Sequence, residues 1–153
     1  MKNETKVERI SENEVVITRT FDAPAQLVFE AWTKPELMRR WWVPRSMGMT
    51  LLACELDVRT GGTYRFVFPS EPEPMAFFGR YLEVTPHSRL VWTNDEGGQD
   101  AGQVSTLTLE ERGETTRIVL HERFPSREAT DAGMGAYDGM PESFAQLDEI
   151  LAG

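Results

Sequence analysis

The chain has 153 residues, 40% of them hydrophobic, and carries a formal net charge of -9 at pH 7. This length and composition predict a single domain over residues 1–153, because one sizeable core can form but not two of usual size. The negative charge argues against a surface for nucleic acid or for an anionic membrane, so we expect apolar or neutral partners.

The N-terminal residues 1–12 are polar and charged, and no apolar run reaches the length that spans a bilayer. We therefore expect a polar N-terminal tail, no membrane insertion and a cytoplasmic location. Cys54 is the one cysteine of the sequence, which excludes an intramolecular disulfide and a thiolate-based metal cluster.

Residues 14–21, EVVITRTF, are rich in β-branched side chains and predict a strand. After Asp22, a candidate N-cap, apolar residues at helical spacing predict a short amphipathic helix over residues 25–32. The next residues, 33–36, read TKPE and have the form of a capping box. A second short helix is expected to begin there and to end at the tryptophans of the stretch RRWWVP.

From residue 49 onward, short apolar or alternating runs are separated by turn sequences rich in glycine and proline. They predict six antiparallel strands, over residues 49–58, 62–68, 75–84, 88–94, 102–111 and 114–123. The acidic stretch NDEGGQDAG, residues 94–102, is expected to be a hairpin connection.

The C-terminal part returns to a helical period, with one apolar face formed by Tyr137, Met140, Phe144, Leu147 and Leu151. Three glycines and a proline interrupt this pattern, and a proline inside a helix removes a backbone hydrogen bond. We expect a kink or break near residues 133–141.

One strand, two short helices, six strands and a long helix form the pattern of an α+β helix-grip fold, a curved antiparallel sheet of about seven strands around the C-terminal helix. A family resemblance is carried by FDAPAQLVFEAWT, RRWWVP, ELDVRTGGTYRF, GRYLEVTP, RLVWT, FPSREA and SFAQLDEILA. On these stretches, from about Val15 to Ala152, the chain resembles the START-like SRPBCC superfamily. Within it, the chain is similar to the homologues of the activator of the ninety-kilodalton heat-shock chaperone ATPase.

This resemblance implies an apolar cavity between the sheet and the C-terminal helix that holds a small hydrophobic molecule, and a link to the stress response. The leading hypothesis is ligand binding without catalysis. One alternative is a chaperone cofactor that uses its outer surface, and another is an enzyme of the hydrolase or cyclase type that uses the same cavity.

Strand alternation indicates which side chains face this cavity. Tyr64, Phe66 and Phe68 share one face, which should point to the helix. On the next strand two registers remain open, with either Phe77 and Tyr81 or Phe78 and Arg80 inward. We favour the first, because an unpaired buried arginine is costly. In the second, Arg80 is a polar anchor for a ligand.

The adjacent Trp41 and Trp42 allow two interpretations: both pack the core, or Trp42 forms a wall of the cavity mouth, where Arg39 or Arg40 meets a polar ligand group. The complete set of cavity candidates is Trp42, Tyr64, Phe66, Phe68, Phe77, Tyr81, Trp92, Met140 and Phe144. The candidate polar anchors are Arg39 and Arg80.

The chain offers little for catalysis or metal binding. It has two histidines and one cysteine, and it lacks the HExxH, CxxC and EF-hand patterns. His121 and Glu122 are neighbours, but on a strand they point to opposite faces. We predict no catalytic residue, no metal and no cofactor.

Overall fold

The computed structural model describes residues 3–95 and 102–152. Its strands are β1 (Lys6–Ser11), β2 (Glu14–Phe21), β3 (Ala53–Leu56), β4 (Thr63–Phe68), β5 (Met75–Thr85), β6 (Arg89–Asn94), β7 (Gln103–Arg112) and β8 (Thr115–Arg123). Its helical segments are α1 (Ala25–Thr33), α2 (Pro35–Trp41), η1 (Arg45–Met47), α3 (Arg127–Gly133), η3 (Met134–Gly139) and α4 (Met140–Ala152).

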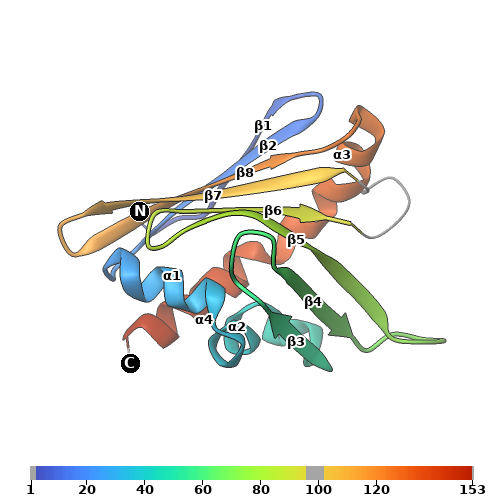
Figure 1. The fold of residues 1–153 in the computed structure, drawn as a ribbon, viewed down its shortest axis with the longest axis horizontal. Coiled ribbons are helices and arrows are strands. Elements are labelled where there is room, and N and C mark those ends of the chain that lie inside the picture. Colours follow the sequence, from blue (N-terminus) through green and yellow to red (C-terminus); the bar gives the residue numbers. More distant parts are fainter. Residues whose placement is uncertain (1–2, 96–101, 153) are drawn as a thin grey trace.

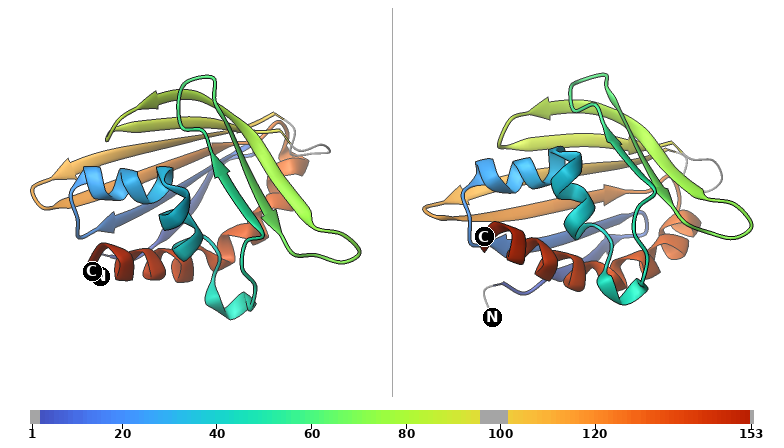
Figure 2. Two further views of the ribbon diagram at one scale, coloured as in Figure 1. Left: turned by 60° about the horizontal axis from the view of Figure 1, so that its bottom comes forward. Right: turned by 90° about the horizontal axis from the view of Figure 1, so that it is seen from below.

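Within the described residues, all strands belong to one antiparallel sheet of order β1-β2-β8-β7-β6-β5-β4-β3 (Figure 1). Figure 2 shows that the sheet is curved and that α1, α2 and α4 lie on one side of it. The predicted α+β helix-grip architecture is confirmed, with eight strands rather than seven. None of the described helices is long and apolar enough to cross a bilayer.

The additional strand is β1, which lies in the segment predicted as a polar tail, so that prediction is wrong. β1 pairs with β2 and places Lys6 opposite Thr18 and Arg9 opposite Val15. It is an edge strand with mostly exposed side chains. It therefore lacks the alternation of apolar and polar residues that identifies a half-buried strand in a sequence.

The six strands predicted between residues 49 and 123 are present, and their ends differ from the prediction by a few residues. The largest difference is at the first, because β3 covers only Ala53–Leu56 of the predicted 49–58. Before it, the short 3-10 helix η1 ends at Gly48, whose φ of 66° suits glycine. Residues 96–101 of the predicted hairpin connection lie outside the described residues.

Helices α1 and α2 occur where the apolar spacing predicts them, but neither uses the predicted cap. The N-cap of α1 is Pro24 rather than Asp22. The N-cap of α2 is Lys34, without a side-chain bond. The Thr33 hydroxyl instead donates to the carbonyl oxygen of Phe29 at 2.9 Å, within the last turn of α1. The predicted capping box is therefore wrong.

The break predicted in the C-terminal helix is present, since η3 separates α3 from α4. Pro141 lies in the first turn of α4, where its missing N–H costs no helical hydrogen bond. Two glycines are needed for packing. A Cβ atom at Gly133 would lie 2.8 Å from the ring of Phe124, and one at Gly139 would lie 3.0 Å from Pro44.

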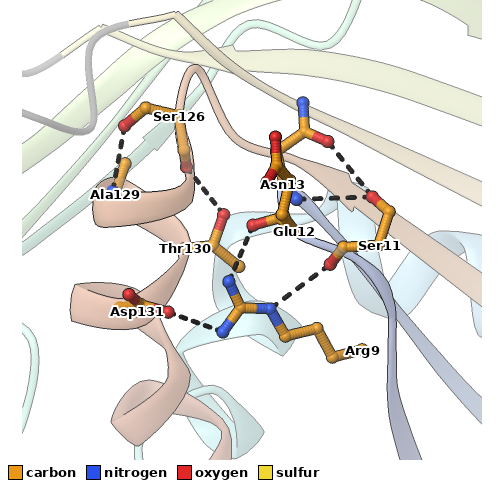
Figure 3. A network of polar contacts seen from close by, with 8 residues as sticks. All are labelled: Arg9, Ser11, Glu12, Asn13, Ser126, Ala129, Thr130 and Asp131. Carbon is orange, nitrogen blue, oxygen red and sulfur yellow. Dashed lines mark hydrogen bonds and ion pairs between the residues drawn. The ribbon is translucent and has the colours of Figure 1, made fainter.

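Polar contacts tie the β1–β2 hairpin to the start of α3 (Figure 3). Arg9 donates to Asp131 at 2.6 Å and to the carbonyl oxygen of Glu12 at 2.7 Å. Ser126 caps α3, because its hydroxyl oxygen accepts from the amide of Ala129 at 3.1 Å. These contacts fix the place of α3 and so the start of η3.

Two side chains fix α4 below the sheet. Gln146 donates to the carbonyl oxygens of Trp41 and Val43 at 3.2 and 3.0 Å. Arg19 of β2 is only 5% exposed and pairs with Asp148 at 2.5 Å. The side chain of Asp148 is 36% exposed, so the pair joins a buried guanidinium to a group at the surface of α4. α4 is thereby held with one face toward the sheet.

Candidate ligand cavity

A cavity of about 680 Å³ lies between the concave face of the sheet and the segments α2, η3 and α4. We call it the grip cavity. The inner faces of β4 to β8 and these helical segments form its walls, and most lining side chains are apolar or aromatic. Its volume falls within the range of about 300 to 1,000 Å³ that is usual for small-molecule sites.

Aromatic rings form one wall of the grip cavity. Trp42 stacks on Phe66 with the ring centroids 5.7 Å apart and an angle of 15° between the planes. Tyr64 lies 5.6 Å from Phe66, and Tyr81 lies 5.8 Å from Tyr64, again between centroids. The row follows from the strand geometry of β4, in which residues two apart point to the same face.

The predicted cavity residues all lie in the lining: Trp42, Tyr64, Phe66, Phe68, Phe77, Tyr81, Trp92, Met140 and Phe144. Of the two registers considered for β5, the structure has the one with Phe77 and Tyr81 inward. Phe78 is 42% exposed on the opposite face. A role of these side chains in ligand binding stays a prediction.

The two adjacent tryptophans have different environments. Trp41 is fully buried, and its indole N–H donates to the carbonyl oxygen of Ala31 at 2.9 Å. Trp42 is half-buried and faces the grip cavity. The ring of Trp32 contacts both, with centroids at 4.8 and 6.0 Å. The first tryptophan packs the core, and the second forms cavity wall.

The two arginines predicted as polar anchors lie outside the grip cavity, so this prediction is wrong. Arg39 is exposed and donates to the carbonyl oxygen of Leu51 at 3.1 Å. Arg80 lies on the outer face of β5 and pairs with Asp95 at 2.9 Å. A guanidinium group inside an apolar cavity would lose its hydration, which explains the outward placement of both.

The inner face of the sheet changes from apolar to polar along β6, β7 and β8. Neighbouring strands contribute their inward residues in rows. One row is apolar and consists of Leu90, Leu107 and Leu120. The next rows are Trp92, Ser105 and Glu122, and then Asn94 and Gln103. We use the name polar end for five lining residues: Asn94, Gln103, Ser105, Glu122 and Tyr137.

Glu122 lies at the centre of the polar end and is 9% exposed. The Ser105 hydroxyl donates to its Oε2 in a short hydrogen bond, and the Tyr137 hydroxyl donates to its Oε1 at 3.4 Å. Burial raises the pKa of Glu122, because the ionised carboxylate loses its hydration, while hydrogen bonds from Ser105, Gln103 and Tyr137 oppose the shift. Of these opposing effects burial is the larger, so the site favours the protonated acid.

Two buried polar atoms of the lining have no hydrogen-bond partner among the described residues. They are Nε1 of Trp32, a donor, and Oδ1 of Asn94, an acceptor. Leaving a buried polar atom unpaired costs about 1 to 3 kcal/mol, and most such atoms in proteins are paired. Both atoms have almost no accessible surface, so a bound molecule would reach them only after a local rearrangement of the lining.

The polar end was not predicted from the sequence, although a signal for it exists. Ile118 and Leu120 are inward-facing core residues of β8, and one more step of the same alternation assigns Glu122 to the inner face. His121 lies on the outer face, where its Nε2 is 2.7 Å from Glu14. The expectation of opposite faces was correct, but the inward member was not identified as a site residue.

Neither the potential metal ligands among the described residues nor the Cys54 thiol is arranged for chemistry. Among residues 3–95 and 102–152, no three His, Cys, Asp or Glu side chains are placed to hold a metal ion. Burial raises the pKa of the Cys54 thiol to about 11, so the unreactive thiol form dominates at neutral pH.

A family model described as Activator of Hsp90 ATPase homolog 1-like protein matches residues 22–152. The chain belongs to this family. The match runs from the start of the helices through α4 and agrees with the resemblance to the START-like SRPBCC superfamily found in the sequence. No curated protein in the comparison matches the chain.

Several solved structures share the fold over nearly the whole length of this chain. A protein from Rhodobacter sphaeroides has 25% identity and a TM-score of 0.83, covering 97% of this chain and 98% of that one. A protein from Chromobacterium violaceum has 26% identity and a TM-score of 0.78, covering 94% and 99%. One from Mycobacterium smegmatis has 20% identity and a TM-score of 0.82, covering 97% and 98%.

Proposed function

We propose that this member of the family binds a small, mainly hydrophobic molecule in the grip cavity. The observation that carries the proposal is an aromatic-walled space of about 680 Å³ inside a single domain. Protein interiors are close-packed, with few voids larger than a water molecule. A space of this size with mainly apolar walls is therefore unusual within one domain, and a bound molecule would remove that apolar wall surface from water.

Binding without chemical conversion fits this lining better than catalysis does. General acid–base catalysis needs groups of matched pKa around one reacting bond. Among the described lining residues, Glu122 is the one acid or base apart from tyrosines. Its raised pKa is compatible with an acid role, so recovery of an added ligand in unchanged form separates binding from a hydrolase or cyclase activity.

Fluorescence titration with the neutral apolar dye N-phenyl-1-naphthylamine tests this function. We expect saturable binding of one dye per chain, with quenching of tryptophan emission because three tryptophans besides Trp41 line the cavity. Ala136→Trp places a large ring at an exposed lining position and should abolish binding. Ala132→Trp, at an exposed position of α3 outside the lining, is the matched control and should bind normally. Absent binding, or equal binding by both variants, would reject the proposal.

A second candidate function is a protein interaction with the Hsp90 chaperone, which the name of the family suggests. The outer face of β5 supports it, because Phe78 and Leu82 are 42% and 46% exposed there. Exposed apolar side chains on one strand face are a common feature of interaction surfaces. A chaperone pull-down that fails with Phe78→Ser and Leu82→Ser, while dye binding is retained, would assign the interaction to this face.

A further inference from the structure

The charge inside the grip cavity restricts the class of ligand. Among its described lining residues, Glu122 is the one side chain that can carry a full charge at neutral pH, and no lysine, arginine or histidine lines the space with it. A buried acid usually has a cationic partner or stays protonated. Here the cavity provides room for a partner that the protein itself does not supply.

We propose that the grip cavity binds a hydrophobic amine, with its ammonium group against Glu122 and its apolar body along the aromatic wall. This inference rests on the proposed ligand-binding function and specifies the ligand for the same site. The ligand then places a cation with hydrogen-bond donors at Glu122 and an apolar part near Trp42 and Phe66.

The polar end offers acceptors that suit an ammonium group. An ammonium group has up to three N–H donors and no acceptor. Glu122 supplies a carboxylate in the lining. Its oxygens already accept hydrogen bonds from the neutral hydroxyls of Ser105 and Tyr137. An ammonium group adds the positive charge that these neutral donors lack, and hydrogen bonds between ionised groups are the stronger ones.

Aromatic rings surround the same end of the cavity. Trp92 shares a row with Ser105 and Glu122, and Tyr137 is hydrogen-bonded to the carboxyl group. Phe124, two residues after Glu122, also lines the space. The electron-rich faces of such rings attract cations, most strongly where water is excluded. A carboxylate combined with aromatic rings therefore favours a cation over an alcohol of the same shape.

An anionic amphiphile such as a fatty acid fits this site poorly. Its carboxylate would meet Glu122, and two carboxyl groups that share a site cannot both ionise without a large raise in one pKa. The net charge of -9 adds a long-range repulsion of anions and an attraction of cations. Charge therefore selects the amine among ligands with equal apolar bodies.

Binding of an amine should depend on pH in a definite direction. Around Glu122 the other groups are the phenol of Tyr137 on η3, neutral Ser105 and Gln103 on β7, and Val15 on β2; His121 faces outward. In the empty cavity, burial favours the protonated acid. An ammonium ion favours the carboxylate, so binding releases a proton, and affinity rises with pH while the amine stays protonated.

Competition against N-phenyl-1-naphthylamine with three matched compounds tests the inference. They are 4-phenylbutylamine, 4-phenylbutan-1-ol and 4-phenylbutyrate, which share one apolar body and differ in the head group. At about pH 8, where an alkylamine is still protonated, we expect the amine to bind at least about tenfold more tightly than the alcohol and the carboxylate to bind most weakly. The affinity for the amine should fall as the pH is lowered from about 8, because protonation of Glu122 removes the negative charge that the ammonium group meets.

Glu122→Gln keeps the shape and the hydrogen-bond acceptor but removes the charge. We expect this variant to bind amine and alcohol within about twofold of each other, with no pH dependence for the amine. Equal amine affinity in the wild type and the variant would overturn the inference. So would tighter binding of the alcohol that weakens as the pH rises, since that assigns Glu122 the role of a neutral donor.

The result also separates this inference from the proposed function. If the dye and the alcohol compete but the amine has no advantage, ligand binding stands and the ammonium site is rejected. If the dye does not bind to the wild type, both are rejected. Should Glu122→Gln fail to fold, the head-group order and the pH series in the wild type decide.

Discussion

Replacing Phe66 by alanine tests whether the grip cavity is empty space beside this ring. Phe66 is 7% exposed, stacks on Trp42 on one side and lies next to Tyr64. Its remaining surface lines the cavity. The substitution therefore enlarges a space that already exists rather than opening a sealed one.

The expected loss of unfolding free energy follows from this geometry. A phenylalanine packed on all sides loses about 3 to 5 kcal/mol on truncation to alanine, which includes a term for the new void. For Phe66 that term is small, and the transfer of the side chain alone accounts for about 1.5 to 3 kcal/mol. Phe21 is the matched control, because it is fully buried, packs edge-to-face on Phe144 at 5.4 Å and does not line the cavity.

Urea unfolding followed by circular dichroism measures both losses, and an unchanged dependence on denaturant shows that the unfolded states are comparable. We expect Phe66→Ala to cost at least about 1 kcal/mol less than Phe21→Ala. A loss for Phe66→Ala as large as the loss for Phe21→Ala would refute the reasoning. It would mean that the ring is packed on every side and that no empty space adjoins it.

Three further predictions concern pH, thiol reactivity and the cavity wall formed by η3. Because burial raises the pKa of Glu122, the folded state holds this proton more tightly than the unfolded state does, and the wild type should lose stability relative to Glu122→Gln as the pH rises above the ordinary value of 4.5. Urea unfolding should show no such trend below that pH. A stability difference that stays constant over the whole pH series would contradict the burial of Glu122. Since burial raises the pKa of the Cys54 thiol to about 11, iodoacetamide should alkylate it slowly at neutral pH until urea unfolds the chain, and equal rates in both states would show an accessible thiolate. Amide exchange should be faster in α3 and η3 than in α4, because 3-10 geometry is less stable. Gly135→Ala, whose added Cβ meets open space, should slow exchange in η3 about two- to fivefold. Uniform exchange over these segments would show that η3 does not open separately.

The sequence predicts most of the fold because the signals for it are local. The alternation of Tyr64, Phe66 and Phe68 and the helical spacing of Phe144 and Leu147 each follow from the geometry of one element. β1 escaped prediction because its partner supplies its hydrogen bonds while its side chains remain in water, so burial leaves no pattern in the sequence. The caps of α1 and α2 also depend on where the chain comes from, which residue types alone do not determine.

The polar end of the cavity was harder to predict because it depends on contacts between distant segments. Ser105 and Glu122 meet only through the pairing of β7 with β8, and Tyr137 covers them only because η3 crosses this end of the sheet. A glutamate near a strand end normally indicates a solvated position. Arg80 is the opposite case. One of the two registers considered for β5 placed this residue in the cavity, whereas in the structure it lies on the outer face and pairs with Asp95.

The central claim is that a small molecule is held in the grip cavity. The most direct test is native mass spectrometry of the protein isolated gently from its own host. The account predicts a species heavier than the chain by the mass of one small molecule, which is released as the protein is activated in the instrument. This species should disappear in Ala136→Trp and persist in Ala132→Trp. The bare chain mass in the wild type, or an equal bound mass in both variants, would contradict the claim.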